Sequence, residues 1–313
     1  MSTVVSCLSE TAKALAKRIC LHENELPIDE TVVARLLREQ FPDLPLHPIR
    51  RIESSGTVHA IFAIGDDLSV RMPRVRYYEE DVLSDWRWLR YFASRLPLQI
   101  PQPVALGEPT EDYPCHWLIV RWIPGENATR FSLRSMGNAA AKLGEFVSTL
   151  RSIDVGGVKI DRYRGRPLRL RDELTREAIS AVGDEYDTRV LSAAWNDSMQ
   201  GPDWSGPPCF FHGDLHSGNL ISTHGALAAV IDFGGIGTGD PSVDGIAGWW
   251  LFDPESRGVF RDAGAFTKEM WARARGWALS IALVALPYYR ESNPAFAGMA
   301  RYAIDEVLSD EKR

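Results

Sequence analysis

Residues 210–221 read FFHGDLHSGNLI and place two histidines, an aspartate and an asparagine between apolar residues. A second stretch, VIDFGG at 230–235, ends an apolar run with another aspartate. Two short β-type runs lie between these polar groups and enclose Thr-His-Gly, a pattern that predicts a β-hairpin. Such a hairpin would bring Asn219 and Asp232 to one face, near Asp214. We therefore expect these three side chains to form one site.

The order and spacing of these residues match the requirements of phosphoryl transfer. One carboxylate has to orient the acceptor hydroxyl, and a carboxylate and an amide oxygen have to hold Mg²⁺, a hard ion that prefers oxygen ligands. Kinase catalytic loops read HRDxxxxN and are followed by DFG. Here His212-Gly213-Asp214, four residues, Asn219 and then Asp232-Phe233-Gly234 reproduce that spacing. Taken singly, HGD is usually a loop and DFG a strand-end turn, but their joint occurrence favours the catalytic interpretation.

The two histidines of the loop are interpreted as structural. We expect His212 to orient the loop rather than to act as a base, and His216 to be a loop histidine, because no second histidine or cysteine completes a zinc site. The cysteines are scattered without a CxxC pair, a spacing that favours neither zinc nor a disulfide framework and that predicts a reducing cytoplasm. They are Cys7, Cys20, Cys115 and Cys209.

The amino-acid composition indicates what kind of protein this is and which ligands suit it. The 313 residues are 45% hydrophobic and 25% charged, as is usual for a globular chain, and the formal net charge is −7. This charge argues against a nucleic-acid partner and weakly favours a cationic ligand. No signal peptide is expected, and the most apolar stretch, 277–289, is too short to cross a membrane. We interpret it as a buried helix that ends at Pro287.

Hydrophobic periodicity predicts an α+β chain with two parts. Helical spacing at 29–41 and 79–95 encloses a hairpin at 54–74, and an apolar strand at 115–123 stops at Pro124-Gly125, a strong turn signal. The rest is mainly helical. We place the boundary after residue 123, which divides the chain into 1–123 and 124–313, and we expect a ligand cleft between the two parts.

The chain resembles the aminoglycoside phosphotransferase family, which also contains macrolide phosphotransferases. The resemblance lies in HGDLHSGNL, IDFGGIGTGDPSVD and SSGTVHAIFAIGDDLSVRMPR, and extends from about Ile28 to Ile246. It implies a protein-kinase-like fold, in which an antiparallel N-lobe with helices is followed by a mainly helical C-lobe. It also implies transfer of the γ-phosphate of ATP or GTP, with Mg²⁺, to a hydroxyl of an antibiotic.

The resemblance assigns roles to individual positions. Asp214 would be the catalytic aspartate, and Asn219 and Asp232 would bind Mg²⁺. The strand at 117–123 would lead into the hinge, where backbone groups meet the purine. The hinge residues are Arg121, Trp122 and Ile123.

The sequence departs from the wider kinase pattern at the nucleotide. Arg71 replaces the usual lysine and Asp85 the usual glutamate, and we expect these two to pair, because a longer arginine offsets a shorter aspartate. Arg74 and Arg76 are alternatives for the phosphate contact. The phosphate loop has one glycine, so its contacts would come from backbone and hydroxyl groups. Its residues are Ser55, Gly56 and Thr57.

The acceptor is less well defined by the sequence. We expect Asp244 to anchor the catalytic loop and Asp240 to cap the turn at Pro241. A cationic aminoglycoside would favour acidic residues among the C-lobe helices, and a macrolide would favour aromatic ones. The acidic candidates are Asp253, Glu255, Asp262 and Glu269, and the aromatic candidates are Trp249, Trp250, Phe252, Trp271, Trp277, Tyr288 and Tyr289.

An aminoglycoside is the first expectation for the acceptor and a macrolide the second. A kinase of a small metabolite and a nucleotide-binding regulatory pseudoenzyme remain alternatives, because a fold does not determine a substrate. The departures at Arg71 and Asp85 motivate the pseudoenzyme, whereas the presence of Asp214 argues against it. The sequence predicts neither a membrane nor an obligate protein partner.

Overall fold

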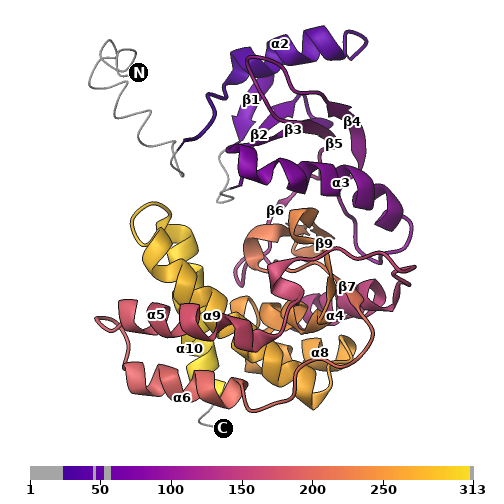
Figure 1. Cartoon of the computed structure of the whole chain (residues 1–313). Coiled ribbons are helices and arrows are strands. Elements are labelled where there is room, and N and C mark those ends of the chain that lie inside the picture. Colours follow the sequence, from indigo (N-terminus) through magenta and orange to yellow (C-terminus); the bar gives the residue numbers. More distant parts are fainter. Residues whose placement is uncertain (1–23, 45–46, 53–57, 311–313) are drawn as a thin grey trace.

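The computed structural model describes residues 24–44, 47–52 and 58–310. A part built on an antiparallel sheet is followed by a larger, mainly helical part (Figure 1). This is the predicted α+β, protein-kinase-like arrangement of two lobes. The exact boundary between residues 123 and 124 remains a prediction.

The N-lobe sheet has five strands in the spatial order β1-β2-β3-β5-β4. Helix α2 lies on one side of the sheet, and α3 lies on the other, between the sheet and the C-lobe (Figure 1). The elements are β1 (Ile49–Ile52), β2 (His59–Ile64), β3 (Leu68–Pro73), β4 (Pro103–Gly107), β5 (Trp117–Arg121), α2 (Glu30–Gln40) and α3 (Glu79–Phe92).

Strand alternation decides which N-lobe side chains face the ligand. Successive side chains of a strand point to opposite faces. In β3, Val70 and Met72 enter the core under α2, whereas Ser69 and Arg71 line a cavity on the other face. The predicted hairpin of β2 and β3 is confirmed, and its register pairs Ile61 with Arg71.

The C-lobe is built around the long helix α9 and one large apolar core. Its helices are α4 (Met136–Ser152), α5 (Asp172–Ala181), α6 (Thr188–Ser198), α7 (Ala247–Trp250), α8 (Pro254–Ala263), α9 (Lys268–Tyr289) and α10 (Pro294–Asp310). Its strands are β6 (Glu126–Asn127), β7 (Cys209–Phe211), β8 (Leu220–Thr223), β9 (Ala226–Val230) and β10 (Gly237–Gly239), which form the sheets β6-β8-β9 and β10-β7.

The expected end of a helix at Pro287 is wrong. Helix α9 begins at Lys268, after the N-cap residue Thr267, whose side chain accepts a hydrogen bond from the Met270 N–H, and it continues past Pro287 to Tyr289. Pro287 lies in the last turn, where its missing N–H removes a single helical hydrogen bond. In the part of the chain that the structure describes, no helix is long and apolar enough to cross a membrane.

Helix α3 joins the two lobes at the site. Its C-terminal residue Phe92 packs edge-to-face on Phe210 of β7, with ring centroids 5.1 Å apart, and also contacts Phe233 of the DFG segment. Aromatic pairs of this kind contribute beyond their buried area. The helix that carries Asp85 is therefore held against β7 and against the segment that contains Phe233.

Sequence periodicity missed several short strands. The proline-rich stretch after α3 contains β4, an edge strand that pairs only with β5. Prolines are tolerated at a sheet edge because their missing N–H faces away from the ladder. The predicted strand at 115–123 is confirmed as β5, although it is shorter than expected.

Candidate active site

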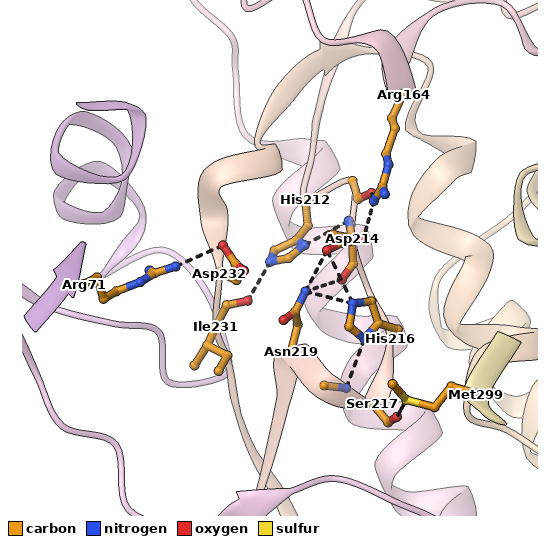
Figure 2. A network of polar contacts seen from close by, with 12 residues as sticks. Arg71, Arg164, His212, Asp214, His216, Ser217, Asn219, Ile231, Asp232 and Met299 are labelled. Carbon is orange, nitrogen blue, oxygen red and sulfur yellow. Dashed lines mark hydrogen bonds and ion pairs between the residues drawn. The ribbon is translucent and has the colours of Figure 1, made fainter. Parts of the chain in front are cut away.

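A cavity of about 1010 Å³ lies between the N-lobe sheet and the C-lobe. Its floor contains Asp214, Asn219 and Asp232, and its N-lobe wall contains His59 and Arg71. The three polar residues that the sequence placed together thus share one cavity. Figure 2 shows Asp214 and Asn219 joined by hydrogen bonds and Asp232 joined to Arg71 on the N-lobe side.

The loop that carries Asp214 is held by backbone hydrogen bonds to a buried carboxylate. Asp244 accepts from the N–H of His212 at 2.8 Å and from the N–H of Gly213 at 2.7 Å, as predicted for an anchor. Burial raises the pKa of Asp244 to about 7, although these two N–H groups act in the opposite direction. Gly213 has φ +84°, which only glycine adopts without strain.

His212 orients the loop and is not placed to be a base. Its Nδ1 accepts from the Asp214 N–H at 3.2 Å, so Nε2 carries the proton and donates to the Ile231 carbonyl at 3.1 Å. Burial lowers the pKa of His212 to about 4, which keeps the ring neutral. The ring links the Asp214 loop to Ile231, which follows β9 and precedes Asp232 (Figure 2).

Asp214 is a carboxylate surrounded by donors. Asn219 Nδ2 donates to its Oδ2 at 2.9 Å and to its carbonyl at 3.0 Å, and His216 Nε2 lies 3.4 Å from Oδ2. Arg164 makes a very close ion pair with Oδ1. Although burial opposes it, Arg164 and His216 hold the pKa of Asp214 well below its usual value of 3.8. Asp214 is therefore ionised at every pH at which the fold is expected to work.

Asn219 is held so that its amide oxygen remains available. Because Nδ2 donates to Asp214, the amide oxygen points away from that residue, toward the side on which Asp232 lies (Figure 2). The backbone of Asn219 is fixed from both directions, since its N–H donates to the His216 carbonyl and its carbonyl accepts from Ile231. The amide oxygen and the Asp232 carboxylate thus face the same region.

Asp232, Arg71 and Asp85 form one chain of charges. Arg71 Nη1 lies 2.6 Å from Asp85 Oδ2, and Nη2 lies 3.0 Å from Asp232 Oδ1. The predicted Arg71–Asp85 pair is confirmed. Burial raises the pKa of Asp85 to about 7 against the lowering effect of Arg71, whereas Arg71 and His59 hold the pKa of Asp232 below its usual value. Asp232 has φ +67°, a left-handed conformation that is uncommon for aspartate.

The predicted hinge residues line the cavity but differ in what they offer. The N–H of Arg121 donates to the Gln102 carbonyl at 2.9 Å, and that of Trp122 donates to the Asp67 carbonyl at 2.8 Å. Among the described residues, the N–H of Ile123 has no such partner. Of the three N–H groups, only that of Ile123 remains to meet a ligand.

The other residues predicted to contact the nucleotide either do not line the cavity or lie outside the described residues. Arg74 is buried and lies 3.6 Å from Glu25, and neither Arg74 nor Arg76 lines the cavity. Ser55, Gly56 and Thr57 lie outside the described residues, so the predicted phosphate loop remains a prediction.

Comparison with known proteins identifies the family. The family model of a phosphotransferase enzyme family matches residues 49–277. The chain belongs to this family. Its match covers the sheet, the catalytic loop and most of α9. No curated protein sequence matches the chain.

Solved phosphotransferase structures share the fold at low identity. The GDP and kanamycin complex of the aminoglycoside phosphotransferase APH(2'')-IIIa has a TM-score of 0.70 at 16% identity, with 90% of this chain and 99% of that chain covered. The gentamicin complex of APH(2'')-IIa has a TM-score of 0.60 at 18% identity, with 90% and 97% covered. The macrolide 2'-phosphotransferase MphH from Brachybacterium faecium has a TM-score of 0.59 at 18% identity, with 89% and 98% covered.

Sequence reasoning missed Arg164, which closes the site from the C-lobe. It lies in the short helical turn η3 (Tyr163–Gly165) and approaches Asp214 from the side opposite to Asn219 (Figure 2). Arg164 and Asp214 are 50 positions apart, and the arginine-rich run DRYRGRPLRLR offers no signal that singles out Arg164. Only the packing of the turn against the catalytic loop selects it.

The acidic acceptor candidates do not line the cavity of this phosphotransferase. Asp253 caps α8, where it accepts from the Ser256 N–H at 2.9 Å. Glu255, Asp262 and Glu269 do not line the cavity either. None of the four acidic candidates therefore lies in the wall of the cavity.

The aromatic candidates divide into core and cavity residues. Trp249, Trp250, Phe252 and Trp277 are buried in the C-lobe core, and Trp271 packs against Trp249. Tyr288 and Tyr289 line the cavity, at the end of α9 that the sequence left outside the helix.

Proposed function

We propose that this chain transfers the γ-phosphate of ATP or GTP to a hydroxyl group of a small-molecule acceptor. The observation that carries the proposal is the meeting of Asp214, Asn219 and Asp232 on the floor of one interlobe cavity, opposite Arg71. Phosphoryl transfer requires positioning and charge stabilisation more than covalent chemistry. The cavity supplies groups that can position the acceptor hydroxyl and groups that can stabilise charge on the phosphates.

Asp214 would orient the acceptor hydroxyl. Its low pKa makes it a weak base, so its main contribution is to accept the hydroxyl hydrogen bond and to direct the oxygen toward the phosphate. Arg164 lies on Oδ1 and Asn219 on Oδ2, which fixes the carboxylate plane. The hydroxyl proton would pass to Asp214 late, when the new phosphate ester bond is nearly formed.

Asn219 and Asp232 fit the requirements of a magnesium site. Both offer oxygen, and Mg²⁺ keeps waters and substrate phosphates as further ligands, so two protein ligands suffice. Asp232 is ionised, and its Oδ2 has no hydrogen-bond partner in the described part of the chain. When bound, the ion would neutralise charge on the phosphate oxygens.

Arg71 and Ile123 would hold the two ends of the nucleotide. Arg71 lies between Asp85 and Asp232 and would contact the phosphates, and its planar fork suits two phosphate oxygens. The N–H of Ile123 would meet the purine. The choice between ATP and GTP is an outcome of the assay below.

The cavity favours an apolar acceptor over a polycation. Apart from Asp214 and Asp232, no described lining residue is acidic, and the C-lobe wall is aliphatic and aromatic. An aminoglycoside carries several ammonium groups that would need carboxylates. Among antibiotics, this wall suits a macrolide better than an aminoglycoside.

A nucleotide-turnover assay tests the proposal. Release of ADP or GDP would be followed with magnesium, ATP or GTP, and panels of aminoglycosides, macrolides and smaller apolar hydroxy compounds. We expect one acceptor class to stimulate release, and we expect Asp214→Asn to lower turnover by about 10³-fold or more while nucleotide binding persists. Asp203→Asn is the matched control, because Asp203 is exposed and pairs with Arg169 outside the site.

Two results would contradict the proposal. Wild-type turnover in Asp214→Asn would remove Asp214 from the reaction. Tight nucleotide binding without turnover in any panel would instead support a regulatory pseudoenzyme. Protection of cells by the protein against one antibiotic class would separate an antibiotic acceptor from a metabolite.

A further inference from the structure

Arg171 is a buried cation on the C-lobe side of the cavity. It ends the short helical turn η4 (Leu168–Arg171), its residue is only 6% exposed, and it lines the cavity. Its charge is not matched by a carboxylate anywhere among the described residues. The titratable groups that act on it are Arg164, which repels it, and Tyr163. Burying an ion without a partner is costly, so this position requires an explanation.

The other buried arginines all have acidic partners. Arg71 pairs with Asp85, Arg74 with Glu25, Arg257 with Glu306 and Arg273 with Asp240. This is the usual rule for buried charges. Arg171 departs from it within the part of the chain that the structure covers. Burial, and then the nearby Arg164, lower its pKa to about 10, so it remains charged at neutral pH.

Among the described residues, the Arg171 side chain makes hydrogen bonds through Nε only. Its Nε donates to Ser280 Oγ at 2.7 Å. Ser280 in turn donates to Thr175 Oγ1 at 2.6 Å, since the Thr175 hydroxyl proton is used on the Arg171 carbonyl at 2.8 Å. The guanidinium also lies 5.2 Å from the Trp277 ring centroid and 5.5 Å from that of Tyr163. Nη1 and Nη2 have no hydrogen-bond partner among the described residues.

Many residues on the C-lobe side of the cavity are aliphatic or aromatic. They include Leu174, Ile281, Val284, Ala285, Tyr288 and Phe296. A ligand that reaches Asp214 from this side therefore meets aliphatic and aromatic surface with two guanidinium groups, those of Arg164 and Arg171. Such a surface attracts an anion and repels an ammonium group.

We propose that Arg171 binds an anionic group of the acceptor. The acceptor then combines an apolar body along α9, a carboxylate or comparable anion on the two free Nη groups, and a hydroxyl at Asp214. The fork of Arg171 suits such a group, because guanidinium binds a carboxylate through two parallel hydrogen bonds. The position of the hydroxyl at Asp214 rests on the proposed phosphotransfer. The anion site at Arg171 does not depend on that proposal.

A binding experiment without nucleotide tests the anion site separately from catalysis. The probes are three apolar hydroxy acids, namely hydroxyphenylpropanoate, hydroxynaphthoate and hydroxydodecanoate, each compared with its methyl ester and with the corresponding amine. Calorimetry would give the affinities for the wild type, Arg171→Met and Arg171→Lys. Arg169→Gln is the matched control, since Arg169 lies two positions away on the same turn but is exposed and paired with Asp203.

We expect the wild type to bind at least one acid about ten- to a hundred-fold more tightly than its ester, and the amine most weakly. Arg171→Met should abolish the preference for the acid and leave the ester affinity unchanged. Arg171→Lys should keep part of it, because it retains the charge but not the fork. Arg169→Gln should behave as the wild type.

Three outcomes would overturn the inference. These are equal affinity for acid and ester in the wild type, an acid preference that survives in Arg171→Met, and failure of every acid to bind. A separate titration measures ADP affinity, because the anion that binds Arg171 could also be a nucleotide phosphate. A loss of ADP affinity in Arg171→Met, without an effect on acids, would assign the residue to the nucleotide and refute the acceptor site. Acid binding, together with an absence of turnover for every panel of the nucleotide-release assay, would contradict the proposed function without affecting the inferred anion site.

Discussion

Arg71 and Arg171 are two buried arginines on opposite walls of the same cavity, and their surroundings differ. Arg71 is 7% exposed and has Asp85 and Asp232 as partners, whereas Arg171 is 6% exposed and has no carboxylate among the described residues. Burial and the two carboxylates together leave the pKa of Arg71 raised, while burial lowers that of Arg171. The chain therefore neutralises one cation itself and leaves the other for a ligand.

The difference corresponds to the two ligands of the proposed reaction. On the nucleotide side, a fixed network holds Arg71 in one position before any phosphate arrives. On the acceptor side, the only side-chain hydrogen bond of the cation among the described residues is through Nε, and its charge faces a cavity whose C-lobe side is largely aliphatic and aromatic. A positioned network suits a co-substrate of constant shape, whereas an unpaired cation selects the acceptor by charge.

The largest expected effect is that of breaking the network around Arg71. Arg71→Met leaves Asp85 buried without a partner and should lower the free energy of unfolding by about 3–5 kcal/mol. It should also weaken nucleotide binding. Urea denaturation and ADP titration measure these two effects. Adding Asp85→Leu should recover part of the lost stability, and a double variant no more stable than Arg71→Met would contradict the coupling.

A smaller effect is expected from pH on the nucleotide side. The pKa of Asp85 is about 7, so the carboxyl is charged above this pH and protonated below it. The KM for the nucleotide should rise as the pH falls from 8 to 6, by about ten-fold, because Arg71 loses one partner. Steady-state kinetics measure the profile. Asp85→Asn should remove the pH step, and a step that persists in this variant would assign it to another group.

The same group predicts the sign of a stability change. The pKa of Asp85 is about 7 in the folded chain and 3.8 as a reference, so its protonated form favours folding. That contribution is complete below pH 3.8 and is lost as the pH rises through about 7. Between pH 3.8 and about 7, the free energy of unfolding of the wild type should therefore fall relative to that of Asp85→Asn.

The smallest expected effect is on the acceptor side. Arg171→Met removes a buried charge that has no partner, so the free energy of unfolding should fall by less than about 1 kcal/mol or should increase. Arg169→Gln, which breaks an exposed ion pair, should change it by less than about 0.5 kcal/mol. A loss of about 3 kcal/mol in Arg171→Met would show that Arg171 has a structural role and would remove the contrast with Arg71.

The meeting of Asp214, Asn219 and Asp232 in one cavity could be predicted because these residues are close along the chain. Asp214, Asn219 and Asp232 lie in one loop and one hairpin, so strand alternation and turn chemistry bring them together. Arg71 and Asp85 needed the resemblance to phosphotransferases as well, since their pairing depends on how α3 crosses the sheet. Their ion pair at 2.6 Å confirms that prediction.

The acceptor side could not be predicted in the same way. The expected acids at 253–269 look suited to a cationic ligand, but none of them lines the cavity. Arg164 and Arg171 belong to a run of arginines with no internal signal, and short 3₁₀ turns have no periodicity that reveals a face. The end of α9 was also placed two residues too early, which removed Tyr288 and Tyr289 from the helix.

The sequence by itself determined the family, the two-lobed fold and the order of the catalytic groups, because local spacing controls turns, hairpins and helix faces over short distances. Only the tertiary structure decided which cations are neutralised. The partner of a buried charge comes from elements far apart in the chain, as Arg71 and Asp232 are 161 positions apart. Whether a carboxylate arrives at such a site depends on packing, and at Arg171 none of the described residues supplies one.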